Sequence, residues 1–215
     1  MPPLDERLVT SLQEALGLRR AVETGTYVGD GARRLAGWFP EVVTIELSED
    51  LHRIASDKLA DLPSVTVLQG HSVDRLPSLV NPEMSTFWFL DGHYSAGGIA
   101  VGEDDPCPVL DELAVIGGGH PDDVVVIDDL RMFAYAPGPP HDPSRWPSLV
   151  TIIDALRRQW PGHHVTVLGD QFIAVPARAR AQVDRRGHEL SDEMYARPMQ
   201  RAKVLLKKAL RRTDS

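Results

Sequence analysis

Apolar and polar positions along most of the chain follow two alternating spacings. Short runs rich in β-branched residues, such as Val124–Ile127, are typical of buried strands. Between these runs apolar residues recur at intervals of three and four, which predicts helices, the first at Leu4–Leu16 with Gly17 as its stop. The expected strands are Arg20–Thr24, Val42–Leu47, Ser64–Leu68, Thr86–Leu90 and Val124–Ile127. The expected helices between and after them are Gly31–Phe39, Ser48–Leu62, Val73–Leu79, Pro108–Ile116 and Ser148–Trp160.

The later part of the chain departs from this alternation. Segment Ala136–Pro147 is rich in Pro and Gly, which predicts a surface loop or lid. His164–Leu168 and Phe172–Val175, joined by Gly169-Asp170, have the pattern of a β-hairpin. Five βα units followed by an antiparallel pair predict an α/β fold: a Rossmann-like three-layer sandwich with a mostly parallel seven-stranded sheet. A dinucleotide-binding fold would more often end in a sixth parallel strand.

The chain is expected to have three parts that differ in length and charge. We expect an N-terminal helix at 1–18, one main domain at 19–176 and a helical extension at 177–215. Residues 1–176 carry 26 Asp and Glu against 12 Lys and Arg, whereas residues 177–215 carry 5 against 11. An acidic body disfavours nucleic acid, because phosphates would be repelled.

The basic extension leaves several interpretations open. Its apolar residues over Ser191–Arg212 have helical spacing, so it is either a solvated helix or a surface that packs on the body or on a second subunit. A homo-oligomer formed through this tail is therefore one possibility, and an interfacial membrane helix is less favoured. No apolar run reaches about 18 residues, so no stable membrane insertion is expected. Cys107 is the single cysteine, which favours a reduced, cytoplasmic setting.

The most informative stretch is residues 22–31, Val-Glu-Thr-Gly-Thr-Tyr-Val-Gly-Asp-Gly. An apolar run ends in Glu23, turns over three glycines and enters a helical pattern. Glycines at the carboxyl end of a strand permit positive φ and close approach of a ligand to the backbone. The spacing Glu-x-Gly-x-x-x-Gly differs from the dinucleotide fingerprint Gly-x-Gly-x-x-Gly.

Two further segments fit a nucleoside beside this loop. Glu46 ends the second strand, where a carboxylate can accept hydrogen bonds from both ribose hydroxyls. NAD enzymes place an acid similarly, so Glu46 does not say which nucleoside binds. The segment Gly70-His71-Ser72-Val73-Asp74 closes the third strand, where Ser72 or a main-chain amide can reach an adenine edge or simply begin a helix.

Three carboxylates follow two strands of the predicted core. Asp91 comes after Trp88-Phe89-Leu90, and Asp128-Asp129 come after Val125-Val126-Ile127. Carboxylates at neighbouring strand ends repel one another unless a cation or a hydrogen-bond network compensates them. Oxygen ligands of this kind suit Mg²⁺, Ca²⁺ or Mn²⁺. The alternative is that one Asp caps a helix and another bonds to the backbone.

Taken in order, these motifs resemble the divalent-metal-dependent O-methyltransferases of class I, which use S-adenosyl-L-methionine (SAM). The resemblance spans residues 19–176 and includes catechol O-methyltransferases and bacterial sugar O-methyltransferases acting on macrolides and aminocoumarins. It implies a metal site for Mg²⁺ or another divalent cation, made of Asp91, Asp128 and Asp129. It implies cofactor-binding residues Glu23, Gly25, Thr26, Tyr27, Gly29, Glu46, Leu47, His71, Ser72 and Asp91.

The chain departs from the catechol enzymes at two points. They have Asp-Asn where this chain has Asp128-Asp129, and they use a lysine base that no lysine here matches. His93 is therefore the candidate base, with Asp91 as another acceptor of the hydroxyl proton, although His93 could instead only pack beside the cofactor. Tyr94–Gly98 is expected to be a mobile loop. Glu103-Asp104-Asp105 and His141 either line an acceptor pocket or face water.

The predicted function is therefore SAM-dependent methyl transfer to a hydroxyl of a small molecule, such as a sugar, a polyketide or a catechol-like diol. The catalytic candidates are Asp91 and His93. The alternatives are a metal-independent N-, C- or carboxyl-methyltransferase, a nucleotide-binding oxidoreductase and a non-catalytic SAM-binding module.

Overall fold

A computed structural model describes residues 4–93, 107–136, 138 and 142–213, with backbone alone from residue 197 onward. Two compact units are present, Met1–Arg180 and Ala181–Ser215. The loop expected at Tyr94–Gly98, the acidic triplet Glu103–Asp105 and His141 lie outside the described residues.

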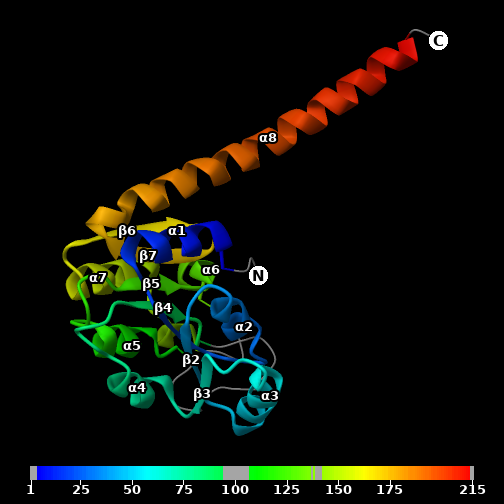
Figure 1. Ribbon diagram of the computed structural model, residues 1–215. Coiled ribbons are helices and arrows are strands. Elements are labelled where there is room, and N and C mark those ends of the chain that lie inside the picture. Colours follow the sequence, from blue (N-terminus) through cyan, green and yellow to red (C-terminus); the bar gives the residue numbers. More distant parts are fainter. Residues whose placement is uncertain (1–3, 94–106, 137, 139–141, 214–215) are drawn as a thin grey trace. The chain divides into compact units, whose positions relative to one another are not determined.

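The first unit is built on a seven-stranded sheet with the order β3-β2-β1-β4-β5-β7-β6 (Figure 1). The strands are β1 Arg20–Thr24, β2 Glu41–Glu46, β3 Val65–Gln69, β4 Thr86–Leu90, β5 Val124–Ile127, β6 His163–Leu168 and β7 Gln171–Pro176. The first five strands are mutually parallel, while β7 runs antiparallel to both β5 and β6. This arrangement confirms the predicted Rossmann-like sheet with its C-terminal hairpin.

Helices cover both faces of the sheet, with α4, α5 and α7 on one side and α2 and α3 on the other (Figure 1). The α-helices of the first unit are α1 Glu6–Leu16, α2 Asp30–Ala36, α3 Glu49–Leu59, α4 Ser72–Arg75, α5 Val109–Ile116, α6 Leu130–Ala134 and α7 Leu149–Gln159. In the described part of the chain short 3₁₀ turns accompany them at Leu76–Ser78, Pro143–Arg145 and Ala177–Ala179. Residues Arg180–Thr213 form the long helix α8, most of which belongs to the second unit.

Local sequence explains most helix ends. Ser48 and Ser148 accept hydrogen bonds from backbone N–H groups of the first turns of α3 and α7, as expected of N-cap serines. Gly17 ends α1 in the left-handed conformation, φ +68°. Helix α6 was not predicted, because its five residues are too few to show a helical period.

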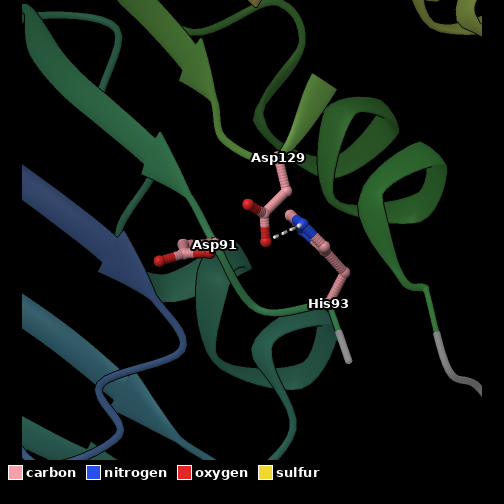
Figure 2. A group of neighbouring side chains, drawn as sticks. All are labelled: Asp91, His93 and Asp129. Atoms are coloured by element: carbon pink, nitrogen blue, oxygen red, sulfur yellow. Dashed lines mark ion pairs between the residues drawn. The ribbon is translucent and has the colours of Figure 1, made fainter. Parts of the chain in front are cut away.

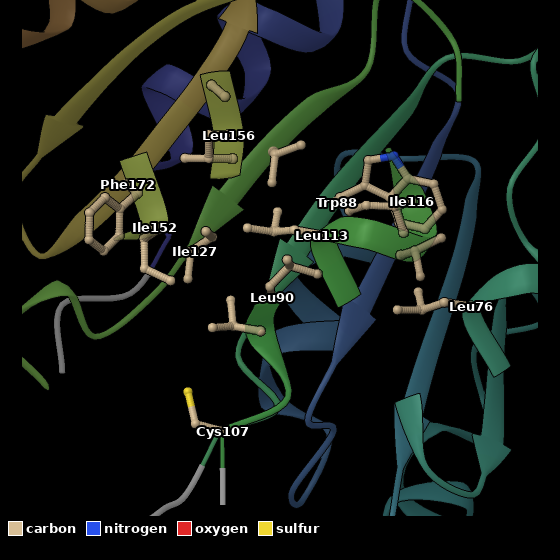
Figure 3. Packing of buried hydrophobic residues seen from close by; sticks show 14 of the residues in the cluster. Leu76, Trp88, Leu90, Cys107, Leu113, Ile116, Ile127, Ile152, Leu156 and Phe172 are labelled. Atoms are coloured by element: carbon tan, nitrogen blue, oxygen red, sulfur yellow. The ribbon is translucent and has the colours of Figure 1, made fainter. Parts of the chain in front are cut away.

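Buried side chains from the sheet and from α5 and α7 form one continuous core (Figure 3). The cluster includes Trp88 of β4, Ile127 of β5, Leu113 of α5 and Phe172 of β7. Cys107 is buried at the edge of the same cluster. Every residue of β1, β4, β5 and β7 is buried, which accounts for the apolar runs in β4, β5 and β7, while β1 buries the polar residues Arg20, Glu23 and Thr24.

Strand register places the candidate site. Thr24 pairs with Leu90, and Leu90 pairs with Ile127, so β1, β4 and β5 end at the same level. The ladder continues one residue further, with Asp91 N donating to Thr24 O at 3.1 Å and Asp128 N donating to Leu90 O at 3.1 Å. The three segments singled out from the sequence therefore leave one edge of the sheet as neighbours.

A search of the described residues found no helix with the length and apolar character needed to cross a bilayer.

Candidate active site

The glycine-rich turn after β1 packs directly on the segment after β4. Gly25 has φ +82°, and a Cβ added there would overlap the backbone carbonyl of Asp91. Tyr27 adopts φ 51°, an uncommon value for an aromatic residue, and Gly29 follows with φ +84° at the start of α2. The chain therefore accepts local strain here to bring two loop backbones together.

Glu46 fixes the far side of this turn. Its carboxylate accepts the backbone N–H of Tyr27 at 2.7 Å and that of Ser48 at 2.9 Å. Glu46 is buried, whereas the side chain of Tyr27 is exposed. Leu47 is half-buried, and its carbonyl accepts the side-chain amide of Gln69 at 3.1 Å. The carboxylate at the end of β2 thus contacts the turn, at the place where the sequence predicts the ribose of the cofactor.

Glu23 lies beneath the turn. Its carboxylate accepts the hydroxyl of Thr44 at 2.6 Å, and that hydroxyl is also 2.6 Å from the hydroxyl of buried Thr26. A Cβ on Gly31 would overlap Glu23 Oε1. Burial raises the pKa of Glu23 to about 8, with the nearby charge of Glu46 adding to the effect. Glu23 is therefore mainly protonated at neutral pH and supports the turn through hydrogen bonds.

The segment after β3 begins helix α4. His71 is its N-cap, with Nδ1 accepting the backbone N–H of Val73 at 3.3 Å. Ser72 is buried. Both predicted cofactor residues are thus at the same sheet edge, one strand beyond Glu46.

Asp91, His93 and Asp129 form a compact group (Figure 2). One potential ligand atom from each lies within 4.8 Å of those of the other two. Asp129 Oδ2 is 3.5 Å from His93 Nε2. The imidazole is buried and has edge contacts with Phe133 at 5.3 Å and Trp146 at 5.9 Å between ring centroids. Aromatic packing therefore fixes the ring of His93 facing Asp129.

Asp128 is placed differently from its neighbour. It is buried, and its Oδ1 accepts the side-chain amide of Gln171 at 3.2 Å. It is not part of the compact group found among the described residues, in which His93 stands beside Asp91 and Asp129. Its charge still acts on the site, since after burial it is the largest cause of the raised pKa of Asp91.

Electrostatics differ across the group. Burial raises the pKa of Asp91 well above its usual range, and the charges of Asp128 and Asp129 raise it further. Burial acts to raise the pKa of Asp129 too, but the contact with His93 and the charge of Arg131 outweigh it and leave the pKa lowered. Arg131 reaches Asp129 Oδ1 at 2.6 Å. Asp129 is therefore ionised. The buried carboxylate of Asp91 lies among other negative charges, so a cation or a proton would stabilise it.

These residues fit a divalent cation. Two carboxylates and an imidazole are a common set of protein ligands, and His93 Nε2 has no hydrogen-bond partner among the described residues despite being buried. The nitrogen donor differs from the oxygen-only set expected from the sequence and suits Mn²⁺ and similar ions better than Mg²⁺. Asp129 has a left-handed backbone, φ 54°, and its carboxylate pairs with Arg131 and His93, whereas that of Asp128 accepts the amide of Gln171.

Sequence reasoning missed Glu112. This residue of α5 is buried beneath the site, where Oε1 would lie 3.2 Å from a Cβ built on Gly92. Burial raises the pKa of Glu112, opposed by contact with the hydroxyl of Ser72 and by His93. Its signal was available: Glu112 occupies the same helix face as Val109, Leu113 and Ile116, all of which are buried. An acid at a core position of a helix indicates a polar environment inside.

Comparisons with known protein families and with curated proteins gave no match. Solved structures do share the fold. A Staphylococcus aureus protein provisionally assigned as a caffeoyl-CoA O-methyltransferase has a TM-score of 0.56 at 15% identity, covering 82% of this chain and 86% of its own. An O-methyltransferase from Bacillus cereus, in complex with S-adenosylhomocysteine (SAH), has a TM-score of 0.52 at 22% identity, covering 81% and 82%. A provisionally assigned O-methyltransferase from Klebsiella pneumoniae has a TM-score of 0.55 at 19% identity, covering 82% and 84%. The chain shares the Rossmann-like fold of these O-methyltransferases.

Proposed function

We propose that this protein is a SAM-dependent O-methyltransferase that uses a divalent cation to bind a small-molecule hydroxyl acceptor. The observation that carries the proposal is the shared sheet edge. There the strained turn Gly25–Gly29 lies against the backbone of Asp91, and the group Asp91, His93 and Asp129 lies at the ends of the two adjacent strands. The solved structures support the choice of cofactor, since one of them holds SAH on the same fold.

Each part of the edge would have its own task. SAM would supply an activated methyl group, and a cation held by Asp91, Asp129 and His93 would lower the pKa of the acceptor hydroxyl. The glycine turn would admit the methionine part of the cofactor, and Glu46 would accept the ribose hydroxyls after releasing Tyr27 N. Asp91 could take the hydroxyl proton on a carboxylate oxygen that is not bound to the cation. His93 can serve as base only if its Nε2 is not a ligand.

A metal-independent methyltransferase is the second candidate, and Arg131 is the observation that favours it. Its guanidinium neutralises Asp129 without any metal ion. Methyl transfer could then use Asp91 as a simple proton acceptor. The two candidates differ in one measurement, because activity that survives EDTA would require the metal-independent form.

A thermal-shift panel tests the function. SAM and SAH should raise Tm, NAD should not, and Mn²⁺ or Mg²⁺ should add a further rise. A rise with NAD alone would point to the oxidoreductase alternative.

Asp129→Ala tests the metal site, with Asp122→Ala as its control. Asp122 pairs with Arg178 and lies ahead of β5, at the other end of that strand. Asp129→Ala should abolish turnover on a panel of catechols and sugars while SAH affinity stays within about twofold, because only a ligand to the cation is lost. Loss of SAH binding in Asp129→Ala would instead make this carboxylate a structural group.

A further inference from the structure

The turn between β6 and β7 is hydrogen-bonded to the segment that follows Asp129. Asp170 O accepts the backbone N–H of Leu130 at 2.8 Å, and Asp170 Oδ1 accepts that of Arg131 at 3.0 Å. Asp170 Oδ2 also forms an ion pair with Arg131 Nη1. The backbone and the side chain of Arg131 are therefore both tied to one residue of the β6–β7 turn.

From this anchor the guanidinium of Arg131 reaches the candidate metal ligand. Nη2 lies 2.6 Å from Asp129 Oδ1, the oxygen not facing His93. Arg131 is half-exposed, whereas Asp129 is buried. The guanidinium of Arg131 thus bridges an outer carboxylate, Asp170, and an inner carboxylate, Asp129. Asp129 therefore has a positively charged partner even when no metal ion is bound.

A second observation concerns the other carboxylate oxygen of Asp129, Oδ2, which faces His93. His93 is buried among Phe133 and Trp146, and its Nε2 points at Asp129 without a hydrogen-bond partner in the described part of the chain. This nitrogen lies 3.5 Å from Asp129 Oδ2 and within 4.8 Å of a carboxylate oxygen of Asp91, which suits a cation shared by the three side chains. Arg131 and a metal ion would therefore act on the same carboxylate.

We propose that Arg131, anchored by Asp170, is an internal counter-ion that competes with the metal for Asp129 and so sets the metal affinity of the site. The inference rests on the cation of the proposed function and adds a positioning pair to it. In the metal-free protein the guanidinium neutralises Asp129. When a cation binds, the guanidinium gives up Asp129 and remains paired with Asp170. Arg131 and Asp170 act through Asp129 and are therefore positioning residues.

The two partners give opposite predictions. Arg131→Gln removes the competitor and a positive charge, so the affinity for Mn²⁺ should rise by about two- to fivefold, the scale of an exposed ion pair. Asp170→Asn keeps an oxygen to accept the backbone N–H of Arg131 but frees the guanidinium to pair with Asp129 alone. The affinity for Mn²⁺ should then fall by a similar factor.

The measurement is Mn²⁺ binding to the full-length protein, followed by electron paramagnetic resonance of the free ion. Arg178→Gln is the matched control. Arg178 is as exposed as Arg131 and pairs with Asp122 at 2.8 Å, at the other end of β5. It loses the same charge, so its Mn²⁺ affinity should equal that of the wild type. SAH affinity and Tm, measured on every variant, report whether the fold is intact.

The double variant Arg131→Gln/Asp170→Asn separates positioning from simple charge. If Asp170 acts through Arg131, Asp170→Asn should have little effect once Arg131 is gone. An unchanged or lower Mn²⁺ affinity in Arg131→Gln, or an equal effect of Asp170→Asn in both backgrounds, overturns the inference and leaves the proposed function standing. A wild-type protein that binds SAH but no Mn²⁺ overturns the inference together with the metal part of the proposed function. A wild-type protein that binds Mn²⁺ but no SAH overturns the proposed function alone.

Discussion

Gly17 and Gly25 share a left-handed backbone, with φ of +68° and +82°, but differ in their surroundings. A Cβ at Gly17 would meet nothing within 4 Å, whereas one at Gly25 would overlap the carbonyl of Asp91. Gly17→Ala should therefore cost about 1 kcal/mol from backbone strain alone. Gly25→Ala should cost more than about 2 kcal/mol and weaken SAH binding, because the two loops must move apart. Urea unfolding and SAH titration of both variants check this; equal losses would show that the loops do not need their close contact.

The buried carboxyl of Glu23 predicts a specific dependence of stability on pH. Its pKa is raised from 4.5 to about 8 on folding, so the folded state holds a proton that the unfolded state releases. The unfolded state binds fewer protons between these values, and stability must fall as pH rises through that window. Near pH 4 the group is protonated in both states and contributes nothing.

Glu23→Gln removes this contribution while keeping the size of the side chain. Wild type and variant should have similar free energies of unfolding near pH 4. The variant should become the more stable protein as pH rises to 8, by an amount on the order of 3–5 kcal/mol at most. Urea unfolding across this pH range is the measurement. A constant difference between the two proteins would mean that Glu23 is ionised in the folded state.

At the scale of single residues, the sequence predicts which residue types lie at the site better than it predicts their contacts. The positions of Glu23, Glu46 and Asp91 at strand ends follow from strand register, which a short apolar run already determines. The different partners of Asp128 and Asp129 do not follow from register, because Asp128 meets Gln171, which is distant in sequence, and Asp129 meets Arg131 and His93. Glu112 was accessible in principle, since its helix face is otherwise apolar.

Among the elements, helix α7 offers a clean test of capping. Ser148 accepts the backbone N–H of Thr151 at 3.2 Å and is exposed, so a substitution there changes the cap without disturbing the core. Ser148→Ala should cost about 1 kcal/mol, and Ser148→Asp should restore stability because its carboxylate caps the helix and favours its dipole. Thermal unfolding of the two variants measures this. An alanine variant as stable as wild type would show that the first turn of α7 is held by packing instead.

Buried strands were predicted closely, and the short helix α6 was not. Strands β4 and β5 have the expected bounds because buried parallel strands are apolar runs that a sequence shows directly, and β1 was also predicted with its observed bounds. Helix α6 lies next to the segment expected as a loop, and the grip of the hairpin turn on Leu130 and Arg131 helps to fix it. Tertiary contacts of this kind leave no local pattern in a sequence.

At the scale of the whole molecule, the sheet and the candidate site lie within the first compact unit, Met1–Arg180. The basic stretch 177–215 lies mostly in the second unit, whereas the strands of the sheet belong to the first. We propose that this stretch mediates self-association, because its excess of Lys and Arg complements the acidic body formed by residues 1–176. The attraction would be screened by salt, as for any contact between exposed charges.

A protein ending at Arg180 separates folding from association. It should unfold cooperatively with a Tm within a few degrees of the full chain, and bind SAH equally well, because the sheet and every predicted cofactor residue are retained. Light scattering at low salt should give a mass above that of one chain for the full-length protein and a monomer for the shortened one, and high salt should make the full-length protein monomeric too. Equal masses at low salt would leave the tail without a role in assembly, since the charge complementarity that motivates the proposal would then have no measurable effect.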